Sequence, residues 1–139
     1  MKSVERRFLL ACLAGKARRP DPGLDWSRFL DRALQNGVAA LAYGSVYGAE
    51  AEYVRSHPEE RVFDEAGQPL SLGDTFFITD LRPGSPWRRR LLAEYRAALK
   101  AFGFDGIHMD TYGRPHSAWA TDGTHIDFAA LYPGLITEA

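Results

Sequence analysis

The strongest constraint on the fold is a long amphipathic helix that leads directly into a short apolar strand. Residues 86–102 place apolar side chains at helical spacing, with Ser85 as the N-cap and Pro86 at the first position, where its missing N–H costs nothing. Gly103 is expected to end the helix, and residues 104–110 follow as a buried strand. A helix that feeds a strand in this way indicates α/β architecture with a parallel sheet.

A second helix and strand occur earlier in the chain. The helix has an apolar stripe, takes Asp25 or Ser27 as its N-cap and ends at Gly37. Residues 38–43 are then continuously apolar, as a strand buried on both faces requires. The alanines of this run suit a helix equally, and its length and flanking glycines favour a strand.

Residues 44–83 form a long, less regular excursion between these two pairs. A short helix is expected within 49–55, a hairpin within 61–72 and a strand at 75–79. A connection of this length inside a compact domain is usually functional. Near the end of this segment, Asp80 is expected to cap the turn before Pro83.

The two ends of the chain are less informative. Residues 1–23 are expected to form an amphipathic helix followed by a turn, and a secretory signal is the weaker interpretation because a Gly–Lys pair breaks the apolar stretch. Localisation therefore stays open. At the other end, residues 111–123 are expected to form a polar loop, and Thr124 to cap a final helix.

Charge and cysteine content exclude several classes of function. The formal net charge is −1, from 17 basic and 18 acidic residues, so no overall field attracts nucleic acid or an anionic membrane. The arginine triplet at 88–90 is interpreted as the solvated surface of a helix. Cys12 is the only cysteine, which rules out an internal disulfide or a thiolate cluster.

No cofactor or metal is expected either. His116, Asp122 and His125 have a spacing that fits no familiar ligand motif. No apolar run approaches the roughly 20 residues that a membrane-spanning helix needs.

Strand alternation determines what Asp110 can do. Ile107 and Met109 point to one side of the strand, whereas His108 and Asp110 point to the other. Barrel enzymes place catalytic groups at the C-terminal ends of parallel strands, which is where Asp110 falls. From the residues alone, a carboxylate that caps the end of the strand is an equally good interpretation. Asp105, at the opposite end, is taken as structural.

Three segments carry a family resemblance. Residues 103–113, which read Gly-Phe-Asp-Gly-Ile-His-Met-Asp-Thr-Tyr-Gly, resemble the nucleophile strand of glycoside hydrolase family 66. Residues 35–43, ending in an Ala–Tyr pair, resemble the preceding barrel strand of that family, and residues 75–87 resemble its next strand, turn and helix entry. The resemblance covers roughly residues 26–138 and leaves the 44–83 excursion least well matched.

The resemblance implies a partial (β/α)8 TIM barrel that covers about the third and fourth β/α units. Family members are dextranases and cycloisomaltooligosaccharide glucanotransferases, which are retaining enzymes acting on α-1,6-linked glucans and are typically exported. Asp110 matches the nucleophile, and the acid/base glutamate of the family lies on a later strand than this chain contains. The isolated chain is therefore expected to be unable to complete catalysis.

Several neighbours of Asp110 are candidates for substrate binding. Tyr43 is expected on the substrate side, and His108 either bonds a sugar or the nucleophile or packs in the interior. Tyr112, His116 and Trp119 lie on the expected loop after Asp110, where aromatic side chains line subsites or anchor the loop. Tyr47 is left open between these two kinds of role.

Two strands cannot close a barrel, so residues 1–139 are expected to be a single incomplete barrel segment, completed by another chain or a longer sequence. The leading hypothesis is a segment of a dextranase-like hydrolase or transglycosylase, with an α-glucan or oligosaccharide as its partner. The alternative hypothesis is a non-catalytic half-barrel that binds carbohydrate or self-associates through its exposed strand edges.

Overall fold

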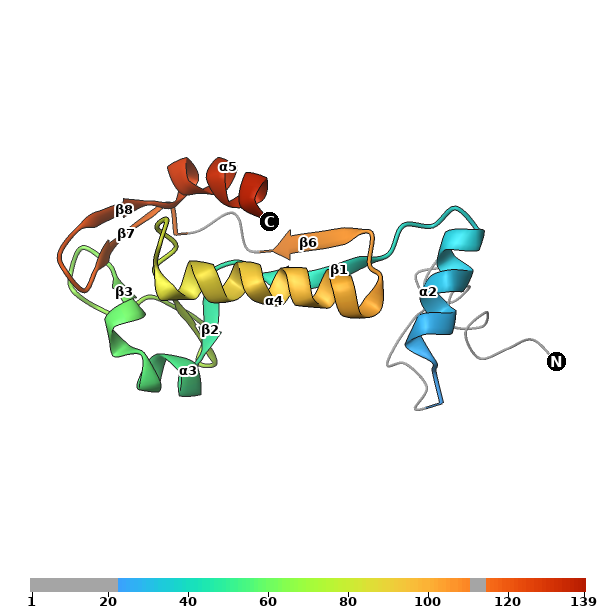
Figure 1. Cartoon of the computed structure of the whole chain (residues 1–139). Helices are drawn as coiled ribbons and strands as arrows, with labels where there is room; N and C mark the ends of the chain where they lie inside the picture. Colours follow the sequence, from blue (N-terminus) through green and yellow to red (C-terminus); the bar gives the residue numbers. More distant parts are fainter. Residues whose placement is uncertain (1–22, 111–114) are drawn as a thin grey trace. The chain divides into compact units, whose positions relative to one another are not determined.

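The computed structural model describes residues 23–110 and 115–139, which divide between two compact units. Of the described residues, unit 1 comprises 23–42 and 97–108, and unit 2 comprises 43–96, 109–110 and 115–139. The described elements, in chain order, are α2 (Trp26–Gln35), β1 (Leu41–Ser45), β2 (Gly48–Glu50), α3 (Ala51–Ser56), the 3-10 helix η1 (Pro58–Glu60), β3 (Val62–Phe63), β4 (Ser71–Leu72), β5 (Phe76–Ile78), α4 (Pro86–Phe102), β6 (Gly106–Asp110), β7 (Ser117–Ala120), β8 (His125–Asp127) and α5 (Phe128–Glu138) (Figure 1).

Helix α2, in unit 1, forms where the sequence predicts it. Asp25 is the N-cap, because its Oδ1 accepts a hydrogen bond of 3.1 Å from the backbone N–H of Arg28. Gly37 follows the helix with a φ of 66°, the left-handed conformation that a glycine adopts most easily. The buried side chains of the helix are Leu30 and Ala33. The predicted helix at the start of the chain lies outside the described residues.

Strands β1 and β6 pair in a two-stranded sheet. The backbone N–H of Asp105 donates to the carbonyl of Ala40 and the Ala40 N–H donates to Oδ2 of Asp105, both at 2.8 Å, which gives Asp105 the predicted structural role. Contacts advance in the same direction along both strands, from Ala40 with Asp105 to Tyr43 with Asp110, as in a parallel pair.

The predicted strand at 38–43 is partly wrong. Strand β1 begins only at Leu41 and continues to Ser45. The prediction that both of its faces are buried also fails, because Leu41 is 53% exposed and Tyr43 is 69% exposed. Both side chains lie on one face of β1, since strand residues two apart point the same way.

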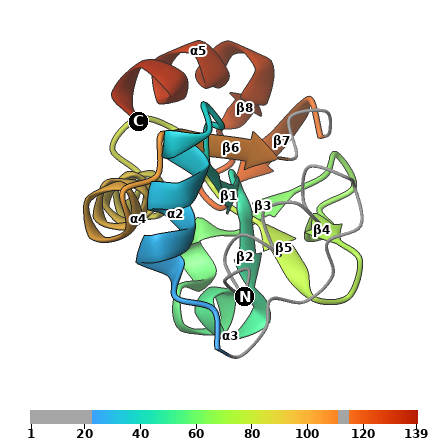
Figure 2. The same cartoon turned by 90° about the vertical axis from the view of Figure 1, so that its right-hand side faces the viewer.

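A three-stranded antiparallel sheet in unit 2 has the order β2–β5–β4 (Figure 2). Helix α3 confirms the short helix predicted within 49–55, and β5 confirms the strand predicted at 75–79. The predicted hairpin is confirmed around its turn, because the Leu70 N–H donates to the carbonyl of Val62 at 3.0 Å. Phe63 bridges Pro69, but β3 then pairs with β7 and β4 pairs with β5.

The second antiparallel sheet of unit 2 has the order β3–β7–β8. The prediction of an irregular loop over 111–123 is wrong where β7 forms. Ala118 and Ala120 of β7 are buried and alternate with the half-buried Ser117 and Trp119. Two small alanines give a weak alternation signal, which explains why the strand was not predicted.

Helix α4 confirms the long predicted helix and its ends. The Ser85 Oγ accepts from the N–H of Arg88 at 3.2 Å, and Gly103 follows the helix with a φ of 67°. The prediction of a fully solvated arginine triplet is wrong, because Arg88 is only 2% exposed. Its position is three and four residues before the buried Leu91 and Leu92, which places it on the same face of the helix.

Helix α5 takes Asp127 as its N-cap, with Oδ1 accepting from the N–H of Ala130 at 3.2 Å. The prediction of Thr124 as the cap is wrong, because β8 occupies residues 125–127. The described chain contains both helices and strands, which is consistent with the predicted α/β class, although two of its three sheets are antiparallel. None of the helices within residues 23–110 and 115–139 combines the length and apolarity that a membrane crossing requires.

Candidate functional site

Asp110 and Tyr43 meet within unit 2, and they form the centre of the candidate site. Asp110 is the last residue of β6, and Tyr43 is the middle residue of β1. The Tyr43 hydroxyl donates a hydrogen bond to Oδ2 of Asp110. The two residues that the sequence indicates most strongly for this site are therefore in direct contact.

The hydrogen bond also shifts the pKa of Tyr43. The bond to Asp110 raises the pKa of the Tyr43 phenol above its ordinary 10.0, and desolvation and the negative charge of the carboxylate act in the same direction. Tyr43 is thus a neutral donor at neutral pH. As a neutral phenol it can donate its proton in the hydrogen bond to the Asp110 side chain.

Helix α4 positions the chain next to Tyr43. The Tyr95 hydroxyl donates to the carbonyl of Ser45 at 3.0 Å, and the Trp87 indole Nε1–H donates to the carbonyl of Val46 at 3.0 Å. Gly44 lies against the Tyr95 ring, and a Cβ atom at Gly44 would come within 2.6 Å of it. The sequence signal for this contact was the glycine inside a strand, which often marks a close approach by a neighbouring group.

The other predicted site residues lie in different settings. His108 is exposed on β6, two residues before Asp110, and His116 is exposed just before β7. Tyr112 lies outside the described residues. Tyr47 is buried, and its ring lies 5.3 Å from that of Phe128, which makes it a core residue.

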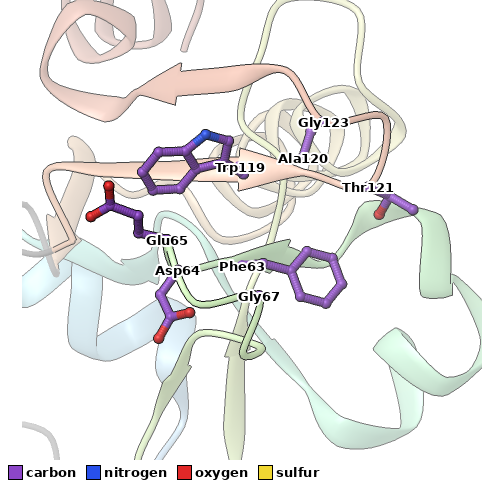
Figure 3. A pocket seen from close by; sticks show the side chains of 8 residues that line it. All are labelled: Phe63, Asp64, Glu65, Gly67, Trp119, Ala120, Thr121 and Gly123. Atoms are coloured by element: carbon purple, nitrogen blue, oxygen red, sulfur yellow. The ribbon is translucent and has the colours of Figure 1, made fainter.

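Trp119 lies in a pocket of about 530 Å³ in unit 2 (Figure 3). The pocket is lined by Phe63, Asp64, Glu65, Gly67, Trp119, Ala120, Thr121 and Gly123. Neither Asp110 nor Tyr43 belongs to this lining. Sequence reasoning treated Trp119 as part of the loop after Asp110, whereas the structure groups it with the turn that follows β3.

Asp80 caps the turn before Pro83, as predicted, and it also forms an ion pair. Its Oδ1 accepts from the N–H of Arg82 at 2.9 Å, and its Oδ2 lies 2.7 Å from the Arg82 guanidinium. The bond to Asp80 raises the pKa of Arg82. Hydrogen bonds from Thr124, followed by Arg82, lower the pKa of Asp122. Within the residues that the structure describes, no three His, Cys, Asp or Glu side chains have a geometry suited to a metal ion.

Comparison with protein families gives a match to the model of glycosyl hydrolase family 66 over residues 25–139. Two curated cycloisomaltooligosaccharide glucanotransferases from Niallia circulans are also similar. One is 24% identical over 127 residues, which cover 84% of this chain, and the other is 26% identical over 113 residues, which cover 76%. The matched regions span only 13% and 12% of the lengths of these two relatives.

A solved structure has a similar fold. The cycloisomaltooligosaccharide glucanotransferase of a Paenibacillus species, complexed with cycloisomaltoheptaose, matches with a TM-score of 0.65 and 24% identity. The match covers 81% of this chain and 17% of that one.

Proposed function

Because the chain belongs to glycosyl hydrolase family 66, we propose that it forms part of the catalytic domain of an enzyme that hydrolyses or transfers α-1,6-linked glucans. The observation that carries this proposal is the carboxylate of Asp110 at the C-terminal end of β6, held by the hydroxyl of Tyr43. Carbohydrate-cleaving barrels place their reacting carboxylates at such strand ends.

In this proposal β1 and β6 are neighbouring strands of a (β/α)8 barrel, about its third and fourth. The parallel order of their contacts and the position of α4 just before β6 support this placement. The similarity in fold to the Paenibacillus enzyme supports it as well. The remaining barrel strands would come from sequence outside these 139 residues.

Asp110 would act as the nucleophile of a retaining mechanism. Its Oδ1 attacks the anomeric carbon, the bond from that carbon to the leaving oxygen breaks, and a glycosyl ester forms. A second carboxyl group, about 5–5.5 Å away, protonates the leaving oxygen and then activates water or an acceptor hydroxyl that releases the sugar. This acid/base would be a glutamate outside the chain. Tyr43 orients the carboxylate by holding Oδ2.

The substrate side of the site would include further residues. His108 is exposed on β6 and Tyr43 is largely exposed on β1, so both are accessible to a sugar. His116, just before β7, and Tyr112 are proposed to contribute from the segment after Asp110. The aromatic ring of Tyr43 offers an apolar face to a pyranose and its hydroxyl a polar edge.

The product of the complete reading frame that contains this chain provides the test. We expect it to act on dextran, and we expect Asp110→Asn to lower kcat by about a thousandfold or more, since the amide cannot form the ester. Tyr43→Phe should lower kcat less, by about ten- to a hundredfold. Asp74→Asn, an exposed change in a turn, is the matched control and should keep full activity. Retained activity in Asp110→Asn, or no activity of the wild type on any α-glucan, would overturn the proposal.

Self-association is a second candidate that we propose, because the β1–β6 sheet has two strands within the described residues, whereas a closed barrel of this class has eight. Size-exclusion chromatography with light scattering on the 139-residue chain tests this directly. A dimer that dissociates on introduction of a proline within β6 is expected, and a well-folded monomer at all concentrations would refute it.

A further inference from the structure

The β3–β7–β8 sheet carries a row of three rings on one face. Phe63 of β3 lies opposite Trp119 of β7, which in turn lies opposite His125 of β8. Residues directly opposite each other have their side chains on the same face of a sheet. The Trp119 and His125 rings are 5.0 Å apart at an angle of 68°. Buried residues occupy the other face, namely Val62, Ala118, Ala120 and Ile126. The row therefore lies on the face away from the core, where Phe63 and Trp119 are half-buried and His125 is exposed.

The two turns beside this row complete a pocket. The turn after β3 provides Asp64, Glu65 and Gly67, and the segment that ends β7 and turns into β8 provides Thr121 and Gly123. Glu65 and Trp119 both line this pocket (Figure 3). The volume of about 530 Å³ falls within the range of small-molecule sites.

The polar groups of the pocket are of two kinds. The Thr121 hydroxyl donates to the carbonyls of Glu59 and Arg61, so it shapes the wall. Asp64 Oδ1 accepts from two backbone N–H groups of its own turn at 2.8 and 2.9 Å, which fixes the orientation of its carboxylate. Within residues 23–110 and 115–139, Asp64 Oδ2 and the Glu65 carboxylate have no hydrogen-bond partner. The pocket thus combines an aromatic face with two acceptor groups.

We propose that this pocket binds a glucopyranosyl unit of an oligosaccharide, at a site separate from the reaction at Asp110. The C–H face of the sugar stacks on Trp119, and its hydroxyls donate to the carboxylates of Asp64 and Glu65. Two carboxylates repel an anionic ligand, and a purely apolar ligand would desolvate them without compensation. A neutral ligand with one apolar face and many hydroxyl donors satisfies both groups. The choice of an α-1,6-glucan as the probe rests on the proposed function.

Binding is measured on the 15N-labelled chain through its three tryptophan indole resonances. Titration with isomaltoheptaose should shift the indole resonance of Trp119, identified by Trp119→Phe. Trp87 is the internal control, because it is buried and its Nε1–H donates to the carbonyl of Val46. Tetramethylammonium tests the alternative of a cationic ligand, which the carboxylates and rings would also attract.

Variants then locate the site. Glu65→Ala should weaken isomaltoheptaose binding about three- to tenfold, whereas the matched exposed change Glu52→Ala should leave it unchanged. Trp119→Ala should weaken it about two- to tenfold, and Glu65→Ala still tests the site if the tryptophan variant does not fold. Asp110→Asn should bind like the wild type.

Each outcome bears on one of the two proposals. A static Trp119 resonance, a response to tetramethylammonium but not to the sugar, or unchanged binding in Glu65→Ala would overturn the pocket proposal. Loss of binding in Asp110→Asn would show that the sugar occupies the reaction site instead. If Trp119 responds and the complete protein has no activity on α-glucans, the pocket stands and the proposed function fails.

Discussion

Replacement of Gly44 by alanine should destabilise the fold, although the same change at an open strand position usually has the opposite effect. The φ of Gly44 lies outside the left-handed region, so its backbone accepts an alanine. Reduced freedom of the unfolded chain would then stabilise the protein by about 0.4–1 kcal/mol. The sign of the measured change therefore distinguishes an open strand position from one in close contact.

The structure predicts the destabilising sign because of Tyr95. The new Cβ atom would lie 2.6 Å from Cε1 and 2.8 Å from the hydroxyl oxygen of Tyr95, well inside the ordinary contact distance of about 3.5 Å. Tyr95 is only 6% exposed and donates to the carbonyl of Ser45, so its ring cannot move without breaking that bond. Overpacking costs about 1–3 kcal/mol and the hydrogen bond about 1 kcal/mol. After the gain from the unfolded chain is subtracted, a net loss of about 1–3 kcal/mol remains.

Urea denaturation followed by circular dichroism measures this loss, with two controls. In a Tyr95→Leu background, Gly44→Ala should cost less than about 0.5 kcal/mol, because the ring is gone. Gly106→Ala on β6 meets only the end of the flexible Leu41 side chain, at 3.2 Å, and should have a small effect. A Gly44→Ala protein as stable as the wild type, or an equal cost in the Tyr95→Leu background, would refute the close contact.

Two further predictions concern buried side chains. Glu138→Gln should lower the free energy of unfolding, measured by urea denaturation, by about 1–2 kcal/mol, because Arg88 loses the negative charge of its partner at 2.8 Å. Arg88 is 2% exposed, but the 46% exposure of Glu138 keeps this loss below that of a fully buried pair. A cost below about 0.3 kcal/mol would contradict this. Burial, followed by the hydrogen bond to Glu60, raises the pKa of Tyr53 to about 12, so Glu60→Gln should lower that pKa but leave it above 10.0 in a 13C NMR titration. The neutral phenol stabilises the fold fully below pH 10 and loses this effect as pH rises through about 12. The difference in stability between wild type and variant should therefore change most steeply across that interval.

Elements with strong local signals were predicted well. Helices α2 and α4 each have a capping side chain before them and a glycine after them, and both form at the predicted positions. Strand β6 forms within the predicted range, but it begins at Gly106 and the prediction that it is buried is wrong, because its residues are half-buried or exposed. The start of β1 was misplaced because its alanine-rich sequence carries little information about where pairing begins.

Features that depend on distant partners were missed. Strand β7 pairs with Val62 and Phe63, which lie far from it in the sequence, and its own residues are mostly small. The burial of Arg88 depends on Glu138, fifty positions further along the chain. A single helix pattern cannot reveal that an arginine on its apolar face will find a carboxylate there.

The candidate site shows the same division. Strand alternation and the position at a strand end made Asp110 a candidate, and the family resemblance then favoured the nucleophile over a capping role. Tyr43 was placed on the substrate side because it lies near the C-terminal end of the preceding strand. The grouping of Trp119 with Glu65 was not predicted, because it arises from the pairing of β3 with β7. The β-turn that holds Asp64 in place was predicted only as the tip of a hairpin.

Detection of a glycosyl ester on Asp110 is the most direct test of the proposed chemistry. The product of the complete reading frame would be incubated with a fluorinated isomaltosyl fluoride, whose electron-withdrawing fluorine slows the breakdown of the ester, and digested for mass spectrometry. We predict that the peptide containing Asp110 gains the mass of the fluorinated sugar and that Asp110→Asn abolishes the label. A label on another carboxylate, or turnover of dextran by Asp110→Asn, would contradict the assignment of Asp110 as the nucleophile.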